Sequence, residues 1–408
     1  MTTTPIPLPD DESAPLRVLV VTESFLPQVN GVTASVCRVV EQLHAAGHQV
    51  AVVAPTGPAR YAEAPVHRVR SLAVPGYADF RLGAATRRRL RRLIAAVRPD
   101  VVHLASPFAL GGVAVEAAAD LGVPTVGVYQ TDLPGFARRY RLTALSPVAA
   151  RRVRRIHALC DLTLAPSAAS VAQLAALDVP RVRHWPRGID GERFTPRRRR
   201  QEVRRRLAPH GEVVVGYVGR LAREKGLEQL RGLDRRPGTR LVLVGDGPMR
   251  RRLEQLLPQA EFLGQRDGDE LADLVAALDV FVHPGAEETF CQSVQEAAAS
   301  GVPTVGVAAG GLLDRISHGV DGLHVAPDHP AELHAAVGRL VADAGLRERL
   351  GAAARRRVAA SSWRAVVAGL VDHYRAAIAA TDASVRARPE STRRTAQTPR
   401  SESHALAG

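Results

Sequence analysis

Lysine is almost absent from this sequence of 408 residues: of the 55 basic residues, all except Lys225 are arginine. Aromatic residues make up 4% of the chain, which leaves little material for a surface that stacks bases. The three cysteines, Cys37, Cys160 and Cys291, lie far apart and form no Cys-x-x-Cys pair. We therefore expect free thiols, and neither a disulfide framework nor a zinc site.

Long apolar runs are absent as well. None reaches the roughly 18 residues needed to cross a bilayer, and the first fifteen residues are polar, acidic and proline-containing, unlike a signal peptide. These features predict a cytoplasmic protein. No Gly-x-Gly-x-x-Gly follows the first apolar run, which disfavours a dinucleotide-dependent oxidoreductase.

The charge, by contrast, is large. A net charge of +14 is typical of proteins that meet an anionic membrane or nucleic acid. Arginine gathers in two clusters, which are Arg87, Arg88, Arg89, Arg91 and Arg92, and then Arg138, Arg139, Arg141, Arg151, Arg152, Arg154 and Arg155. The first cluster shares a predicted amphipathic helix with Leu90, Leu93, Ile94 and Val97. Such a helix suits either peripheral contact with the inner face of the plasma membrane or an ordinary solvated surface. Binding to nucleic acid is less favoured than either, because no aromatic residues interleave these arginines.

Apolar runs of strand length alternate with helical segments along most of the chain, which predicts an α/β fold with parallel, doubly wound sheets. The alternation pauses at an arginine-rich stretch after Pro186, so we expect two Rossmann-like domains that face each other across a cleft. The expected boundaries are a disordered N-terminus (1–15), a first domain for the acceptor (16–185), a linker (186–211), a second domain for the donor (212–360), a closing helix (361–380) and a disordered tail (381–408).

The lone lysine stands just after a strand. The run Val213 to Val218 leads into Gly219-Arg220, and Lys225 follows about one turn later. Ligands of open α/β sheets bind at the carboxyl ends of strands, where a compact ammonium suits a crowded phosphate group. We therefore expect Arg220 and Lys225 to hold a diphosphate, although an interdomain salt bridge would also explain them.

A second cluster follows the strand that ends near His283. Glu288 and Glu296 are spaced Glu-x7-Glu, and a helix expected from about Phe290 would offer unpaired amides and a positive dipole end to an anion. On spacing alone, the two carboxylates also fit a solvated helix. Isolated histidines such as His103 and His283 are expected to be structural, bonded to backbone groups.

Together these motifs resemble a known family. Gly219-Arg220-Leu221, Glu224-Lys225-Gly226, Gly245-Asp246-Gly247-Pro248, the Glu288/Glu296 pair and Ser300-Gly301-Val302-Pro303 are similar to motifs of the retaining GT-B glycosyltransferases of family four. The stretches Glu23 to Val32 and Tyr129 to Asp132 further resemble actinobacterial GDP-mannose-dependent α-mannosyltransferases. The resemblance covers roughly residues 16 to 380. It implies transfer of a sugar, mannose from GDP-mannose, to a lipid-linked or glycoside acceptor in α linkage.

The resemblance also implies roles for individual residues. Arg220 and Lys225 would bind the donor diphosphate, Glu296 the ribose, and Glu288 the transferred sugar. Amides at Thr289 and Phe290 would hold sugar or phosphate oxygens, while Gly219 and Gly31 would let backbone approach the donor. Where this chain has Gln130, many relatives have a histidine that reaches the donor sugar. Gln130 can donate a hydrogen bond but cannot shuttle a proton near neutral pH, so either Asp132 takes over part of the histidine's role or that role is absent. Arg187 stands where relatives often carry asparagine.

Several points stay open in the sequence. A sugar-nucleotide epimerase or hydrolase of the same fold is a rival reading. The base, sugar and acceptor depend on loops such as 75–82 and 133–146. No cofactor or metal is expected, since Asp267-Gly268-Asp269 fits a helix start in which Asp269 is the N-cap.

Overall fold

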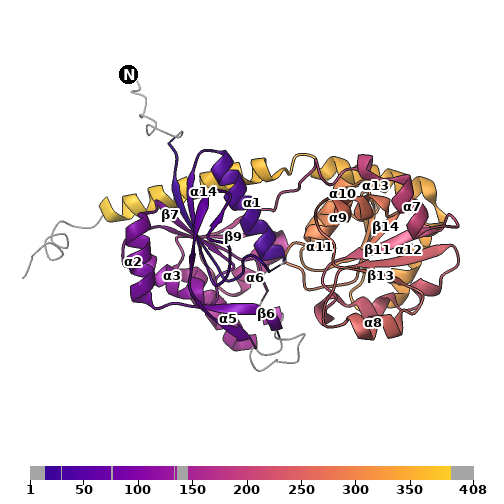
Figure 1. Ribbon diagram of the computed structural model, residues 1–408, viewed down its shortest axis with the longest axis horizontal. Helices are drawn as coiled ribbons and strands as arrows, with labels where there is room; N and C mark the ends of the chain where they lie inside the picture. Colours follow the sequence, from indigo (N-terminus) through magenta and orange to yellow (C-terminus); the bar gives the residue numbers. More distant parts are fainter. Residues whose placement is uncertain (1–13, 29, 75–76, 133, 136–145, 387–408) are drawn as a thin grey trace, which may run out of the picture.

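The computed structural model describes residues 14–386, apart from 29, 75–76, 133 and 136–145. It has two α/β lobes side by side, and the last long helix crosses from the second lobe back over the first (Figure 1). Within the described residues, no helix is both long and apolar enough to cross a bilayer. The arrangement confirms two Rossmann-like units.

The first lobe contains an eight-stranded sheet of order β10-β9-β8-β7-β1-β2-β4-β3, in which all pairs except β3–β4 are parallel. Hairpin β5–β6 lies outside it. The elements are β1 (Arg17–Thr22), α1 (Gly31–Ala45), β2 (Gln49–Ala54), β3 (Arg60–Tyr61), β4 (Ala64–Arg68), β5 (Arg70–Val74), β6 (Tyr77–Ala84), α2 (Arg87–Val97), β7 (Val101–Ala105), α3 (Leu110–Ala119), β8 (Thr125–Val128), α5 (Ser146–Leu159), β9 (Leu162–Ala165), α6 (Ala168–Ala176) and β10 (Val182–His184).

The second lobe has six parallel strands of order β13-β12-β11-β14-β15-β16. Its elements, with the final helix, are η2 (Pro196–Arg198), α7 (Gln201–Leu207), β11 (Val213–Val218), η3 (Arg223–Lys225), η4 (Leu227–Leu230), η5 (Leu233–Arg235), β12 (Thr239–Val244), α8 (Arg250–Leu256), β13 (Glu261–Gly264), α9 (Gly268–Ala277), β14 (Val280–His283), α10 (Gln292–Ala299), β15 (Thr304–Val307), α11 (Leu312–Arg315), β16 (Gly322–Val325), α12 (Pro330–Ala342), α13 (Ala344–Val358) and α14 (Trp363–Arg386).

Strand β1 shows why apolar runs become central strands. Val18 and Val20 pack into one core cluster, while Leu19 and Val21 pack into another on the opposite face. A parallel strand covered on both faces needs an apolar side chain at every position, unlike an exposed strand that alternates. The strands lie in register at their carboxyl ends, which therefore meet along one edge of each sheet.

Helix α14 belongs to the first lobe although it follows the second in sequence. Leu370 and Tyr374 are fully buried in the cluster that contains β1 and α1, and the Tyr374 hydroxyl bonds His103 Nδ1 at 2.8 Å. The helix was expected over 361–380 and runs to Arg386. His103 therefore has a side-chain partner, which corrects the expectation of a backbone one.

The chain crosses between the lobes twice, and the crossings touch. The Ile189 amide donates to the Ser361 carbonyl at 2.7 Å. A Cβ on Gly188 would lie 2.5 Å from Trp363 Cα, so only glycine fits this contact. Part of the expected linker packs with the second lobe, since Leu207 of α7 is fully buried in that core. In the described part of the chain, two connecting segments that lie side by side thus join the lobes.

Candidate active site

Lys225 and Glu288 meet at the carboxyl edge of the second sheet. Strand β11 ends at Val218 and leads to Lys225, and β14 ends at His283 and leads to Glu288. These strands are neighbours in the sheet, which brings the two following loops together. The Lys225 ammonium donates to Glu288 Oε1, with 20% and 14% of the two side chains exposed. The predicted cation and carboxylate therefore share one site.

His283 completes this cluster. Its Nε2 lies 3.3 Å from Glu288 Oε1, and its ring packs 5.7 Å from the Tyr217 ring, between centroids. Burial would raise the pKa of Glu288, but the Lys225 ammonium and His283 outweigh burial and hold that pKa below its usual range. Burial opposes the charge of Lys225, yet Glu288 keeps the Lys225 pKa above its ordinary value. The expectation that His283 bonds backbone groups was wrong: it contacts the carboxylate directly.

Arg220 and Gly219 lie at the same edge. The Arg220 side chain is exposed, and its backbone carbonyl accepts a hydrogen bond from the Tyr217 hydroxyl at 3.1 Å. Gly219 has φ of +152°, and a Cβ there would lie 2.7 Å from the Tyr217 hydroxyl oxygen. Both facts require glycine, which lets the chain turn sharply out of β11 and places Arg220 beside the site.

The segment after Glu288 contacts the first lobe. Thr289 Oγ1 donates to the Gln130 carbonyl at 2.9 Å, and Ser170 Oγ donates to the Thr289 carbonyl at 3.3 Å. Phe290 is buried, and its ring carries the Arg315 guanidinium 4.5 Å from the centroid. The helix expected from Phe290 begins instead at Gln292 in the structure, because Cys291 adopts φ of +67° as its N-cap. The amides of Thr289 and Phe290 therefore precede the helix.

On the first lobe, Gln130 follows β8 and Gly31 begins α1. Arg187 links them: its Nη2 donates to Gln130 Oε1 at 2.6 Å, and a Cβ on Gly31 would lie 3.1 Å from its Nη1. The sequence singled out Arg187 as unusual but assigned it no contact. Its burial beside Gln130 is a finding that residue type alone did not reveal.

Two expected site residues lie apart from the Lys225 cluster. Asp132 accepts hydrogen bonds from the Gly135 amide at 2.9 Å and the Tyr129 hydroxyl at 3.2 Å, both within the first lobe. Glu296 lies in α10, and burial raises its pKa from 4.5 to about 8, with Arg38 opposing and Asp190 adding to that shift. No described contact joins either carboxylate to Lys225 or Glu288.

One described group could offer metal ligands, since ligand atoms of His283, Glu288 and Cys291 lie within 4.8 Å of one another. A cation there would compete with the Lys225 ammonium for the same carboxylate oxygen. The other motif proves structural. Asp267, not Asp269, is the N-cap of α9, and Asp269 forms ion pairs with Arg193 and Arg198 at 3.4 and 3.0 Å. The assignment of Asp269 as the cap was therefore wrong.

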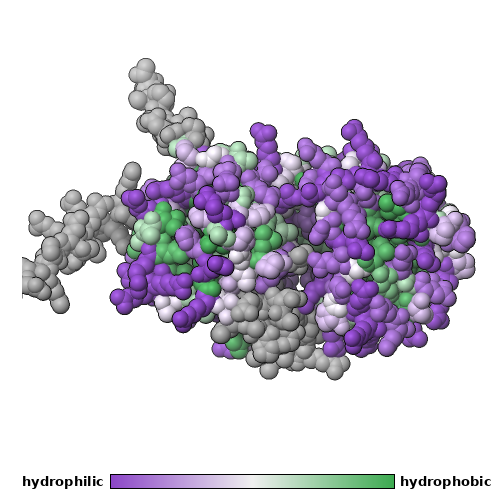
Figure 2. Space-filling view, viewed as in Figure 1, coloured by the Kyte–Doolittle hydropathy of each residue, from purple (hydrophilic) through white to green (hydrophobic). Residues whose placement is uncertain are grey.

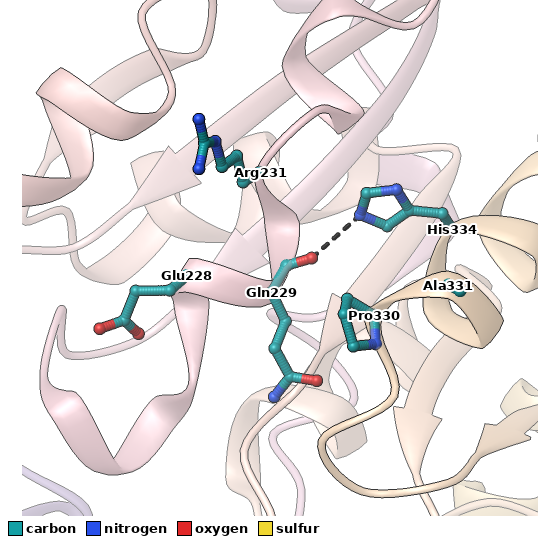
Figure 3. Close-up of a pocket in the computed structure, with 6 residues that line it drawn as sticks. All are labelled: Glu228, Gln229, Arg231, Pro330, Ala331 and His334. Carbon is teal, nitrogen blue, oxygen red and sulfur yellow. Dashed lines mark hydrogen bonds between the residues drawn. The ribbon is translucent and has the colours of Figure 1, made fainter.

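A pocket of about 470 Å³ lies on the second lobe, between η4 and the start of α12 (Figure 3). His334 Nε2 lies 3.0 Å from the Gln229 carbonyl at its wall. None of the expected site residues lines this pocket. The Lys225 cluster, and not this pocket, brings together the cation and the carboxylate that the sequence singled out.

Comparisons with known proteins agree with this architecture. The family model Glycosyltransferase Family 4 matches residues 29–193, and Glycosyl transferases group 1 matches residues 199–357. Sucrose-phosphate synthase from Thermosynechococcus elongatus superposes with a TM-score of 0.73 at 24% identity, covering 90% of this chain and all of that one. Anabaena HepE in complex with UDP-glucose gives 0.72 at 18% identity, covering 88% and 100%. These two likenesses establish the fold.

Other known proteins have a higher sequence identity to this chain than these two structures. A GDP-mannose-dependent alpha-mannosyltransferase of Mycobacterium tuberculosis is 47% identical over 88% of this chain and 97% of its own length. The protein of that name from Corynebacterium glutamicum is 42% identical over 90% of both chains. A sulfoquinovosyl transferase of Arabidopsis thaliana is 35% identical over 91% of this chain and 76% of its own. The chain therefore belongs to the GT-B glycosyltransferases that join a family 4 domain to a group 1 domain.

Proposed function

We propose that this glycosyltransferase moves mannose from GDP-mannose to a hydroxyl of a lipid-linked or glycoside acceptor, with retention in α linkage. The observation that carries the proposal is the Lys225–Glu288 pair at the cleft edge of the second sheet. Two relatives above 40% identity bear the corresponding name, which supports GDP-mannose as the donor. The sulfoquinovosyl relative makes donor choice the first point to test.

The proposed chemistry is charge stabilisation. Breaking the bond between the sugar and the diphosphate leaves negative charge on the departing nucleotide, and fixed cations lower that barrier. Lys225 and the exposed Arg220 would receive this charge. The proposed donor-binding residues are Gly31, Gln130, Gly219, Arg220, Lys225, Glu288, Thr289, Phe290 and Glu296. Asp132 remains a predicted catalytic group, and Asp132→Asn tests it by turnover.

In the structure, Lys225 and Glu288 neutralise each other. We propose that a bound diphosphate draws the ammonium away, which frees the Glu288 carboxylate for hydroxyls of the transferred sugar. His283 keeps its contact with Glu288 through this exchange, so the carboxylate is not left uncompensated. Substrate binding and assembly of the site are then one event.

The proposal is tested by turnover with a panel of nucleotide sugars that includes GDP-mannose, GDP-glucose, UDP-glucose and UDP-sulfoquinovose, each with and without candidate glycolipid acceptors. We expect GDP-mannose to be used best and the product to be an α-mannoside by NMR. Turnover should survive EDTA, because the charge is received by side chains. Preference for UDP-sulfoquinovose would overturn the donor assignment, and acceptor-independent donor consumption would favour an epimerase or hydrolase.

We also propose that the first lobe contacts anionic lipid through α2 and α5. Leu90 and Ile94 of α2 are buried, so its arginines lie on the outer side, as expected for an amphipathic helix. Val148 of α5 is 55% exposed beside Arg151, which supports an apolar contact within a basic surface. Glu116 of α3 and Asp120 at its C-cap neutralise part of the charge through Arg155 and Arg87. Arg138, Arg139 and Arg141 lie outside the described residues.

Sedimentation with phosphatidylglycerol vesicles at low salt tests the lipid proposal. Charge reversal of the exposed Arg88 and Arg92 should weaken binding, since each basic residue near an anionic surface contributes about 1 kcal/mol. The matched control reverses Arg251 and Arg252, which are exposed on α8 of the second lobe. If both double variants lose vesicle binding equally, the effect is one of overall charge. If reversal of Arg88 and Arg92 leaves binding unchanged, the proposed face is refuted.

A further inference from the structure

We propose that Arg187 is a positioning residue, which fixes the side-chain amide of Gln130 so that its nitrogen, Nε2, donates to a hydroxyl of the transferred sugar. The inference rests on the donor site proposed above. It assigns a specific task to the hinge residue that the sequence marked as unusual, and it names the group on the first lobe that recognises the sugar.

Arg187 is held almost entirely inside the protein. The residue is 6% exposed, its guanidinium lies 5.8 Å from the Phe290 ring centroid, and its carbonyl accepts a hydrogen bond from Gln295 Nε2 at 3.2 Å. Among the described residues, no carboxylate lies within ion-pair distance of it. A buried guanidinium that bonds a neutral amide costs desolvation energy, and burial lowers the pKa of Arg187 to about 10 although the charge of Glu288 partly opposes that shift. Such a costly group suggests a function beyond packing.

The chemistry of the contact fixes how the Gln130 amide lies. A guanidinium has only N–H donors, so it must face the amide oxygen and not the amide nitrogen. Arg187 Nη2 donates to Oε1 at 2.6 Å, and rotation of the amide by half a turn would set N–H against N–H. Nε2 is therefore directed away from Arg187. It has no hydrogen bond to any described residue, and it is not among the fully buried atoms that lack a partner.

The free nitrogen belongs to a residue at the cleft. Gln130 follows the carboxyl end of β8, where ligands of such sheets bind, and its own carbonyl is bonded to Thr289, the neighbour of Glu288. The Gln130–Thr289 bond thus brings the residue that carries the amide donor next to the segment that begins at Glu288. Glutamine cannot transfer a proton near neutral pH, but a fixed donor can discriminate between a hydroxyl and its absence.

A direct contact of Arg187 with the substrate is the competing explanation, and a double-mutant cycle separates the two. The variants are Arg187→Met, Gln130→Ala and the pair together, with Arg251→Met on the surface as control, and kcat and KM are measured for the donor that the parent uses. Each single change should lower kcat about 10-fold or more. The double variant should match Gln130→Ala within about threefold, because without the amide Arg187 has nothing to orient. If the double variant instead loses kcat by the product of the two single losses, the proposal is overturned.

Two further measurements guard against misfolding. Gln130→Glu keeps the shape and gains an ion pair with Arg187 but lacks an N–H donor, so we expect a stable protein with kcat as low as Gln130→Ala. For the parent, removing one particular hydroxyl of the donor sugar should lower kcat/KM about 10²-fold. Both Gln130 variants should use the donor and that deoxy analogue about equally well. Undiminished rejection, or full activity of Gln130→Glu, would overturn the proposal. The test uses whichever nucleotide sugar the parent accepts, so a wrong donor assignment does not decide its outcome.

Discussion

At the residue scale, the decisive feature is that Lys225 and Glu288 are each other's counter-ion. Removing one leaves the other charged and poorly solvated, so a single substitution affects both stability and chemistry. The ammonium is also the only lysine in the sequence. An arginine would not restore the geometry, since a planar fork cannot take the place of a compact point charge.

Substitution of either partner should therefore be costly. We expect Lys225→Ala and Glu288→Gln to lower kcat by about 10² or more. The Lys225→Arg variant should keep a kcat below about a tenth of the parent value. Steady-state kinetics with saturating donor measure the effect, and Arg251→Ala is the surface control. Rates within a few-fold of the parent in both variants would show that this pair does not act on the developing charge.

Glu296 supplies a pH dependence. Burial raises its pKa from 4.5 to about 8, so the folded state binds a proton that the unfolded chain has released between these values. Stability from this group is complete below pH 4.5 and is lost as pH rises through 8. We expect Glu296→Gln to melt at the same temperature as the parent near pH 5 and at least ~2 °C higher near pH 8.5. A gap that does not grow with pH would contradict the raised pKa.

At the element scale, sequence patterns predicted the central strands because every position of a doubly covered strand is apolar. The apolar runs that alternate with helical segments along the chain appear as β1, β2, β7, β8, β9 and β11–β16. Strands β3 to β6, over 60–84, escaped prediction because they carry no such run. Helix α14 was predicted as a helix, but an amphipathic pattern does not say which lobe its apolar face covers.

The site divides in the same way. Lys225 and Glu288 could be predicted because both follow strand ends, which the sheet brings together. The His283 contact and the Arg187–Gln130 bond could not, because each depends on side chains that come close only after the chain has folded. The helix start was misplaced by two residues because Cys291 adopts a left-handed conformation, which a residue type other than glycine does not signal in the sequence.

That conformation gives an element-scale test. Cys291 holds φ of +67° at the N-cap of α10, which costs a residue with a Cβ about 1–2 kcal/mol relative to glycine. Cys291→Gly should therefore be more stable than Cys291→Ala by about 1 kcal/mol, although both lose the buried thiol. Denaturant unfolding of the two variants measures the difference. Equal stability would mean that the loop before α10 relaxes freely.

At the scale of the whole molecule, arginine ion pairs add to the apolar contacts through which the linker packs on the second lobe. Arg198 pairs with Asp273 at 3.1 Å, and Arg199 with Asp279. The surface is correspondingly polar over most of the face seen in Figure 2, with apolar patches limited to small areas of each lobe. The dense arginine stretch after Pro196 is thus a set of ion pairs with α9 and its neighbouring loop.

Helix α14 ties the end of the chain to the first lobe, and one substitution tests how strongly. Leu370 is fully buried against the core that contains β1 and α1, so Leu370→Ala should cost about 2–5 kcal/mol. We expect the first lobe to become the less stable one, seen as faster proteolysis within 16–185 while the second lobe stays protected. The exposed neighbour Arg364→Ala is the control. Loss of both lobes together would indicate that they unfold as one unit.

The return of α14 also sets an order of events during synthesis. Domains generally fold as they leave the ribosome, amino-terminal first. Here the first lobe leaves the ribosome with part of one face of its sheet uncovered, because the residues of α14 that pack there beside α1, Trp363 to Ala377, are translated after the second lobe. The second lobe can therefore fold before α14 packs on the first lobe. Nascent chains stalled before Trp363 should therefore be the species that chaperones hold longest.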